Sequence, residues 1–177
     1  MTIDLTVRPA VPADAGAISA IYNHYVRTST CTFEEEPETL AHRLAWLEGH
    51  RGAHVALVAE ESDGGIVGWA SLSPFHARSA YRFTVEDSVY LREDRRGRGL
   101  GKVLLCRLMD AARAGGFRNV IACICAEQEA SIALHRRAGF REVARMTQVG
   151  MKFGRWLDIV YLQAGPVPPL SIVDGGA

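Results

Sequence analysis

Three glycines alternate with basic residues in the stretch "DRRGRGLGK" (residues 94–102), directly after the apolar run "SVYL". Glycine lets a backbone approach a ligand closely. A helix that begins at such a loop presents unpaired N–H groups and the positive end of its dipole, which suits an anion such as pyrophosphate. A solvated basic turn that caps a helix is the alternative. The residues expected to hold the anion are Arg96, Gly97, Arg98, Gly99, Leu100, Gly101 and Lys102.

Two common phosphate-binding motifs do not fit this spacing. A P-loop would need glycine where Arg96 stands, and serine or threonine where Val103 follows the lysine. A G-x-G-x-x-G fingerprint fails as well, because Lys102 or Leu104 occupies the position of its third glycine. The pattern that does fit is a strand, a glycine loop and a helix over residues 100–114, with apolar residues at helical spacing.

Composition limits the partners. The chain has 177 residues, 48% hydrophobic and 23% charged, as expected of one ordinary globular domain. The formal net charge is zero and the pI is near 7.0, so we expect neither nucleic acid nor an anionic membrane as the main partner. No apolar run approaches the roughly 20 residues of a membrane span, and the amino end lacks a signal-peptide layout. These features predict a cytoplasmic protein.

Strand and helix patterns alternate along the chain. Strands are expected at 3–10, 84–91 and 117–125, and hairpins at 54–75 and 142–163. Helices are expected at 14–28, 38–50, 100–114 and 129–140, with Asp14 as an N-cap and Leu40, Leu44 and Leu47 on the apolar face of the second. This order predicts one α/β domain with a mixed sheet over residues 1–164, followed by a Pro/Gly-rich tail at 165–177.

The cysteines and histidines do not suggest a metal site. Cys123 and Cys125 should share one face of a strand, and no C-x-x-C occurs. We expect these thiols, with Cys31 and Cys106, to be buried and reduced. The six histidines are scattered without ligand spacing, so no metal is expected.

The motif R-x-x-G-x-G, from Arg96 to Gly101, closely resembles the acetyl-CoA loop of GNAT-family N-acetyltransferases. The order of elements around it also resembles that family. Five blocks, "NHYVRTST", "ARSAY", "TVEDSVYL", "LHRRAGF" and "KFGRWLD", look like the phosphinothricin acetyltransferase subfamily, including its methionine sulfoximine and sulfone acetylating members. The resemblance implies a GNAT fold with splayed strands at the acetyl-CoA site. It also implies acetyl transfer to the primary amine of a small amino-acid-like substrate, and a homodimer with active sites near the interface.

Acetyl transfer to an amine needs a proton acceptor, because a protonated amine cannot attack a thioester. The resemblance places the catalytic glutamate at Glu86, at the start of the strand that leads to the glycine loop. Apolar neighbours would have to raise its pKa from roughly 4.3 for efficient base catalysis near pH 7. Asp87 should face the other side of the strand. His135 stands where many GNAT enzymes carry a tyrosine proposed to protonate the leaving thiolate; a structural histidine is the equal alternative.

The pantetheine arm of acetyl-CoA needs a splayed strand whose backbone can bond its amides, and the strand residues Val89 and Leu91 are assigned to it. Ser131 fits the family pattern. Gln128 stands where many relatives carry an asparagine that bonds the pantetheine, and its amide reaches one methylene further out.

For the acceptor, Arg78 and Tyr81 offer a planar fork and a hydroxyl to a carboxylate, and Phe33 and Phe75, with Trp69, could form the pocket wall. The segment "KFGRWLD", with Lys152 and Trp156, is expected to build a hairpin or a subunit contact. Two other functions stay open: acetylation of a peptide or protein amine, to which the acidic "FEEEP" loop would contribute, and a non-catalytic acetyl-CoA-binding module.

Overall fold

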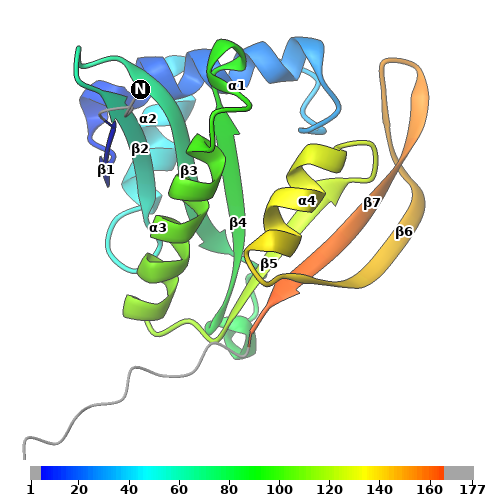
Figure 1. Ribbon diagram of the computed structural model, residues 1–177. Coiled ribbons are helices and arrows are strands. Elements are labelled where there is room, and N and C mark those ends of the chain that lie inside the picture. Colours follow the sequence, from blue (N-terminus) through cyan, green and yellow to red (C-terminus); the bar gives the residue numbers. More distant parts are fainter. Residues whose placement is uncertain (1–4, 166–177) are drawn as a thin grey trace, which may run out of the picture.

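The computed structural model describes residues 5–165 as a seven-stranded mixed sheet with helices on both faces (Figure 1). The strands lie in the order β1-β2-β3-β4-β5-β7-β6. The β4–β5 pair is parallel and the other neighbouring pairs are antiparallel. The strands are β1 (Leu5–Pro9), β2 (Ala56–Glu61), β3 (Ile66–Pro74), β4 (Thr84–Leu91), β5 (Asn119–Cys125), β6 (Arg141–Lys152) and β7 (Arg155–Ala164). The mixed α/β sheet predicted from the alternation of elements is confirmed.

Four α-helices and three short 3-10 turns connect these strands. The helices are α1 (Ala15–Thr28), α2 (Leu40–Gly49), α3 (Leu100–Ala114) and α4 (Glu129–Arg137), and the turns are η1 (Pro12–Asp14), η2 (Ser79–Tyr81) and η3 (Glu93–Arg95). α3 and α4 pack on one face of the sheet and α1 and α2 on the other, so two hydrophobic cores sandwich it (Figure 1). The predicted tail, apart from Gly165, lies outside the described residues.

Local chemistry explains where several elements begin and turn. The side chain of Thr39 accepts a hydrogen bond from the His42 amide at 3.2 Å, which caps α2. The β2–β3 hairpin turns at Gly64, whose φ of 83° favours glycine. Asp14 stands at the N-cap position of α1, but its carboxylate pairs with Arg8 at 2.7 Å and accepts from the Val11 amide instead.

The predicted apolar face of α2 is wrong in part. Leu47 is buried, but Leu40 and Leu44 are exposed, and Arg43 is buried in their place. The guanidinium of Arg43 pairs with Glu38 and lies 4.3 Å from the centre of the Trp46 ring, so both its charge and its flat face are satisfied inside the protein. The buried face of α2 is therefore built around a cation instead of a continuous leucine stripe.

β4 and β5 separate after three paired residues, and this separation creates the site. Their pairing runs from Thr84–Asn119 to Glu86–Ile121 and ends there. Beyond Glu86 the two strands diverge, and α4 lies over the gap between them (Figure 1). β7 pairs with β5 along its length and with β6 on its other side, so the second half of the sheet turns away as one unit.

Candidate active site

A cavity of about 980 Å³ opens where β4 and β5 separate. It runs from the glycine loop and the start of α3 to the loop that follows α1. The predicted site residues that line it are Phe33, Glu86, Val89, Leu91, Arg96, Gly97, Gly99, Gly101, Lys102, Gln128, Ser131 and His135. The structure thus brings the expected anion loop, base and helix histidine to one cavity.

The glycine loop is open toward the cavity. Gly97 has a φ of 75° and Gly99, the N-cap of α3, a φ of 81°, and no other group lies near the place of a side chain at either position. Within residues 5–165, the amides of residues 97–101 donate to no other residue. Gly97, Gly99 and Gly101 line the cavity, so their N–H groups are available to a ligand there. Arg98 is exposed and Leu100 is buried in the core, and neither side chain lines the cavity.

The open edge of β4 presents backbone groups to the same cavity. The Arg92 amide donates to the Val67 carbonyl at 2.8 Å, which fixes the hydrogen-bonding register of β3 and β4. In an antiparallel ladder alternate residues point their N–H and C=O groups away from the partner strand. Val89 and Leu91 therefore turn these groups toward the gap left by β5. Tyr25 donates its hydroxyl to the Leu91 carbonyl at 2.7 Å and anchors the end of this edge.

Glu86 lies at the point of separation. It is half-buried, and within the described chain its carboxylate has no hydrogen-bond or ion-pair partner. Burial, and then the charge of Asp87, raise the pKa of Glu86 above its ordinary value of 4.5. An unpaired carboxylate with a raised pKa, facing a cavity, can accept a proton more effectively than a solvated one.

His135 and Asp87 form a buried pair in the same cavity. As the strand alternation predicts, Asp87 faces away from Glu86, toward α4. Nε2 of His135 lies 2.9 Å from Oδ2 of Asp87, and Nδ1 lies 2.8 Å from the Ser131 carbonyl. Burial lowers the pKa of His135, but the hydrogen bond and charge of Asp87, with the Ser131 carbonyl, outweigh it, and the net shift is upward.

Gln128 joins two parts of the cavity wall. It is the N-cap residue of α4, and its Nε2 donates to the Thr30 hydroxyl at 3.0 Å. Thr30 belongs to the loop after α1, and it also donates to Glu127 at 3.2 Å. The amide N–H groups of Gln128 thus contact the protein, which leaves its carbonyl oxygen as the group available to a ligand.

The four predicted acceptor residues separate into two groups. Phe33 lines the cavity, as Glu86 does. Phe75, Arg78 and Tyr81 lie outside its lining, in and beside the turn η2 between β3 and β4. The Phe75 and Tyr81 rings contact each other at 5.8 Å between centroids, and Arg78 is exposed.

The predicted thiol burial is partly wrong. Cys125 is buried and Cys31 is half-buried, whereas Cys106 and Cys123 are exposed. Cys123 lines the cavity between β4 and β5. It lies beyond the last paired residues of these strands, so β4 does not cover it. Within residues 5–165 no group of three or more His, Cys, Asp or Glu side chains could hold a metal, and no helix is long and apolar enough to cross a membrane.

Two contacts of the site differ from what the sequence predicts. Asp87 faces away from Glu86, as expected, and it pairs with His135. Lys152 lies on the predicted hairpin, but its ammonium is buried against the loop after α1. A lysine at the end of an exposed strand carries no sequence signal of burial, whereas the strand alternation could have directed attention to Asp87 as a partner on the helix side.

Separated parallel strands above a glycine loop and a helix N-terminus define a CoA-dependent acyltransferase site. The chain belongs to the Acetyltransferase (GNAT) family, whose family model matches residues 18–140. GNAT enzymes use acetyl-CoA as the co-substrate, so the chain is an acetyl-CoA-dependent acetyltransferase.

Similar proteins cover nearly the whole chain. A methionine sulfoximine/methionine sulfone acetyltransferase of Pseudomonas paraeruginosa is 43% identical over 94% of this chain and 97% of its own length. A phosphinothricin acetyltransferase from Sinorhizobium meliloti, solved with acetyl-CoA, is 38% identical with a TM-score of 0.88 over 98% of this chain and 97% of that one. A solved ribosomal-protein-alanine N-acetyltransferase from Brucella melitensis is 42% identical with a TM-score of 0.87, over 90% of this chain and 99% of that one.

Proposed function

We propose that this enzyme transfers the acetyl group of acetyl-CoA to the primary amine of a small amino-acid-like substrate. The substrates that the names of its relatives suggest are methionine sulfoximine, methionine sulfone and phosphinothricin. The observation that carries the proposal is that Glu86, a carboxylate with a raised pKa and no partner among the described residues, shares one cavity with an open glycine loop.

The cofactor end of the cavity has the groups that acetyl-CoA requires. The free amides of Gly97, Gly99 and Gly101 and the positive end of α3 would bind the pyrophosphate. Arg96 and Lys102 in the lining, and the exposed Arg98 beside it, would add charge. The edge of β4 at Val89 and Leu91 would bond the pantetheine amides. Gln128 and Ser131, at the N-cap and in the first turn of α4, line the same cavity and would contact the same arm.

Glu86 would remove the proton from the acceptor amine, directly or through a water molecule, as the amine attacks the thioester. His135 has both ring nitrogens engaged, so it has no free lone pair with which to act as a base. We propose that its imidazolium, paired with the Asp87 carboxylate, has a structural role in the cavity wall. Protonation of the leaving thiolate by His135 is then dispensable, because a thiolate is a good leaving group.

The acceptor would bind between Glu86 and the loop after α1, where Phe33 forms part of the wall. Arg78 and Tyr81 are the proposed partners of its carboxylate, with Phe75 supporting the Tyr81 ring. These three residues lie outside the lining of the cavity. Their proposed role therefore needs a test of its own, and Arg78→Ala provides it. It should raise the KM of the amino acid without changing that of acetyl-CoA.

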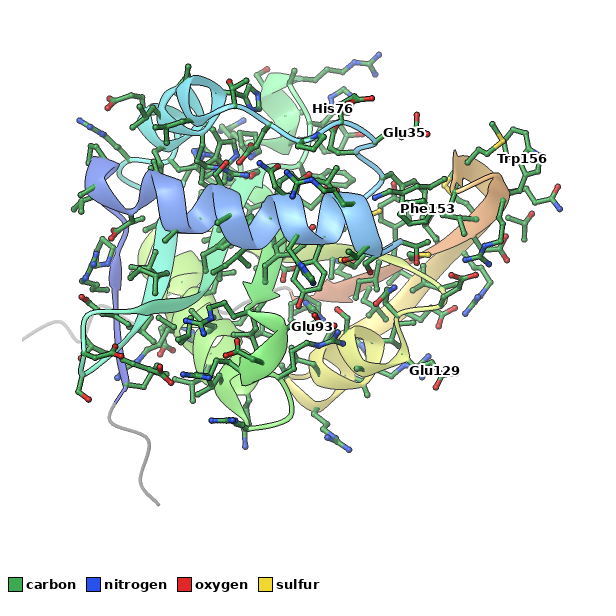
Figure 2. All side chains as sticks on the ribbon, turned by 90° about the horizontal axis from the view of Figure 1, so that it is seen from above. Glu35, His76, Glu93, Glu129, Phe153 and Trp156 are labelled. Carbon is green, nitrogen blue, oxygen red and sulfur yellow. The ribbon has the colours of Figure 1, made fainter. Side chains whose placement is uncertain are left out.

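We also propose that the enzyme is a cytoplasmic homodimer. The β6–β7 hairpin exposes six large apolar side chains, more than a solvated strand pair needs, and we refer to them as the hairpin patch: Val143, Met146, Val149, Met151, Phe153 and Trp156. Figure 2 shows Phe153 and Trp156 at the tip of this hairpin, at one end of the molecule. The four cysteines are free thiols, which suits a reducing compartment.

A peptide or protein amine is the second candidate acceptor. The name of the Brucella relative favours it, and so do the exposed carboxylates Glu34, Glu35 and Glu36 beside Phe33, which would attract a basic peptide. Both candidates share the chemistry of Glu86 and differ in the size of the acceptor.

A thiol-release assay separates the two. Methionine sulfone, methionine sulfoximine and phosphinothricin should be acetylated with higher kcat/KM than the common amino acids and than short peptides with free amino termini. Preference for an alanine-terminated peptide over all three amino acids would replace the first proposal with the second.

A further inference from the structure

The loop after α1 carries the acceptor wall, and it has little regular structure of its own. Residues 29–33, which we refer to as the acceptor loop, lie between α1 and α2. Cys31, Thr32 and Phe33 from this loop line the cavity. A segment with few backbone partners needs contacts from elsewhere to hold one conformation.

We propose that Lys152 and Gly150 of β6 are positioning residues that lock the acceptor loop and so shape the acceptor end of the cavity. The inference rests on the proposed function, because it assigns that end of the cavity to the amine substrate. Neither residue contacts the cavity itself. Both act through the loop.

Lys152 donates hydrogen bonds to two backbone carbonyls of the acceptor loop, one at each end of the turn from Ser29 to Thr32. Its Nζ lies 2.9 Å from the Ser29 carbonyl and 2.7 Å from the Thr32 carbonyl, and the residue is only 2% exposed. Within residues 5–165 the ammonium forms no salt bridge. The carboxylates whose charges act on it, Glu34 and Glu35, belong to the segment that follows the same loop. Burying an ammonium is costly without partners, so these two carbonyls, with the Phe153 ring whose centre lies 5.0 Å from Nζ, must compensate for that cost.

Gly150 receives the Phe33 ring. A Cβ atom added at Gly150 would overlap that ring, so only glycine leaves space for it. Gly150 and Lys152 are two residues apart on β6 and therefore face the same side of the strand. One residue thus fixes the loop's backbone and the other its aromatic side chain.

Other contacts confirm that the acceptor loop is held from outside. The Thr32 hydroxyl lies 2.8 Å from the Tyr22 hydroxyl on α1, and the Gln128 amide donates to Thr30 from α4. Lys152 is the buried charged member of this set. Met151 and Phe153 of the hairpin patch are the neighbours of Lys152 in the chain, so the surface proposed to contact a second copy adjoins the residues that hold the acceptor loop.

The kinetic consequence follows from loop disorder. Without the contacts from Lys152 and Gly150, the acceptor loop samples conformations that cannot bind the acceptor. The apparent affinity for the acceptor is then the intrinsic affinity multiplied by the fraction of molecules whose loop is competent to bind. Saturating acceptor selects the ordered loop again. Lys152→Met should therefore raise the acceptor KM about 10-fold to 100-fold, the range for loss of hydrogen bonds to a charged group. kcat and the KM of acetyl-CoA should stay within about threefold.

Two further variants sharpen the test. Gly150→Ala reaches the same loop without changing charge and should raise the acceptor KM in the same way. It keeps the inference testable if Lys152→Met does not fold. Arg145→Met is the matched control, because Arg145 lies on the same strand with an exposed side chain that pairs with Glu142. Its acceptor KM should equal that of the wild type.

The sequence contains two lysines, Lys102 and Lys152, so the ¹⁵N-lysine ammonium spectrum has two signals. We expect one slowly exchanging signal that Lys152→Met removes, independent of any acceptor. Fast exchange of both signals, or a Lys152→Met variant that loses thermal stability while keeping the wild-type acceptor KM, would overturn the inference. If the wild type acetylates none of the amino acids, the proposed function fails and the ammonium spectrum still tests the lock.

Discussion

Nε2 of His135 on α4 lies 2.9 Å from Oδ2 of Asp87 on β4, while its Nδ1 lies 2.8 Å from the Ser131 carbonyl. Carbonyl and carboxylate oxygens only accept hydrogen bonds, so both ring nitrogens carry protons when Asp87 is ionised. Oδ1 of Asp87 is buried and has no hydrogen-bond partner within the described residues. The pair therefore places an imidazolium and a carboxylate together inside the cavity wall.

This pair should make stability depend on pH. Because the pKa of His135 is raised above 6.5, folding takes up a proton between 6.5 and the native value. The stabilisation is complete below pH 6.5 and is lost as the pH rises through the native pKa. Denaturant unfolding of the wild type should show this loss, and His135→Asn should remove the slope in that range. Imidazole ¹⁵N shifts typical of a neutral ring at pH 6.5 would contradict the assignment.

Replacing Glu86 by glutamine keeps its shape but removes its basicity. We expect Glu86→Gln to lower kcat by about 10²-fold to 10⁴-fold, the usual contribution of a general base. The affinity for acetyl-CoA, measured by calorimetry, should not change. Glu48→Gln on α2 is the control, since that carboxylate is exposed and, among the described residues, pairs only with Arg51. If Glu86→Gln keeps more than about half of the wild-type kcat at neutral pH, Glu86 is not the base.

The pH profile gives an independent test of the same residue. A base must be deprotonated, so the wild-type rate should fall as the pH drops through the pKa of Glu86. That pKa is raised by burial and by Asp87, so the midpoint of the acidic limb should lie above 4.5. In Glu86→Gln this limb should vanish, while the residual rate still climbs as free amine accumulates. An acidic limb that persists in the variant would assign it to another group.

Gly99 tests the cofactor loop. Its φ of 81° disfavours any β-branched residue, and a side chain there would block the approach of the pyrophosphate to the backbone. Gly99→Val should weaken acetyl-CoA binding sharply in calorimetry. Gly52→Val is a matched control, because Gly52 has the same φ of 81° and an equally open environment in a turn after α2. Equal acetyl-CoA affinity in the two variants would argue against the glycine loop as the pyrophosphate-binding site.

Trp156 tests the dimer. It is 61% exposed, the highest value in the hairpin patch, and a glutamate there should be incompatible with an apolar interface. Light scattering of Trp156→Glu at micromolar concentration should give the monomer mass, whereas the wild type should give twice that mass. Leu40→Glu places the same charge at an exposed leucine of α2 and should leave the dimer intact. A monomeric wild type would remove the dimer from the proposal.

Local signals along the chain are enough to predict the fold class and the cofactor end of the site. The helix after the glycine loop was predicted at 100–114 and occupies Leu100–Ala114, because glycines, basic residues and helical apolar spacing are all local signals. The strand at 84–91 was equally well defined, and its alternation correctly placed Glu86 and Asp87 on opposite faces. A resemblance carried by several separate blocks then defined the family and indicated its chemistry.

Which distant groups meet in the site depends on the folding of the whole sheet. The divergence of β4 and β5 after Glu86, the pairing of Asp87 with His135 and the burial of Lys152 against the acceptor loop depend on how two halves of the sheet turn away from each other. Contacts between residues 48 or 120 positions apart leave no periodic mark in the chain. Burial of a charged side chain is likewise set by the partners that surround it in space, and residue type alone predicts the opposite.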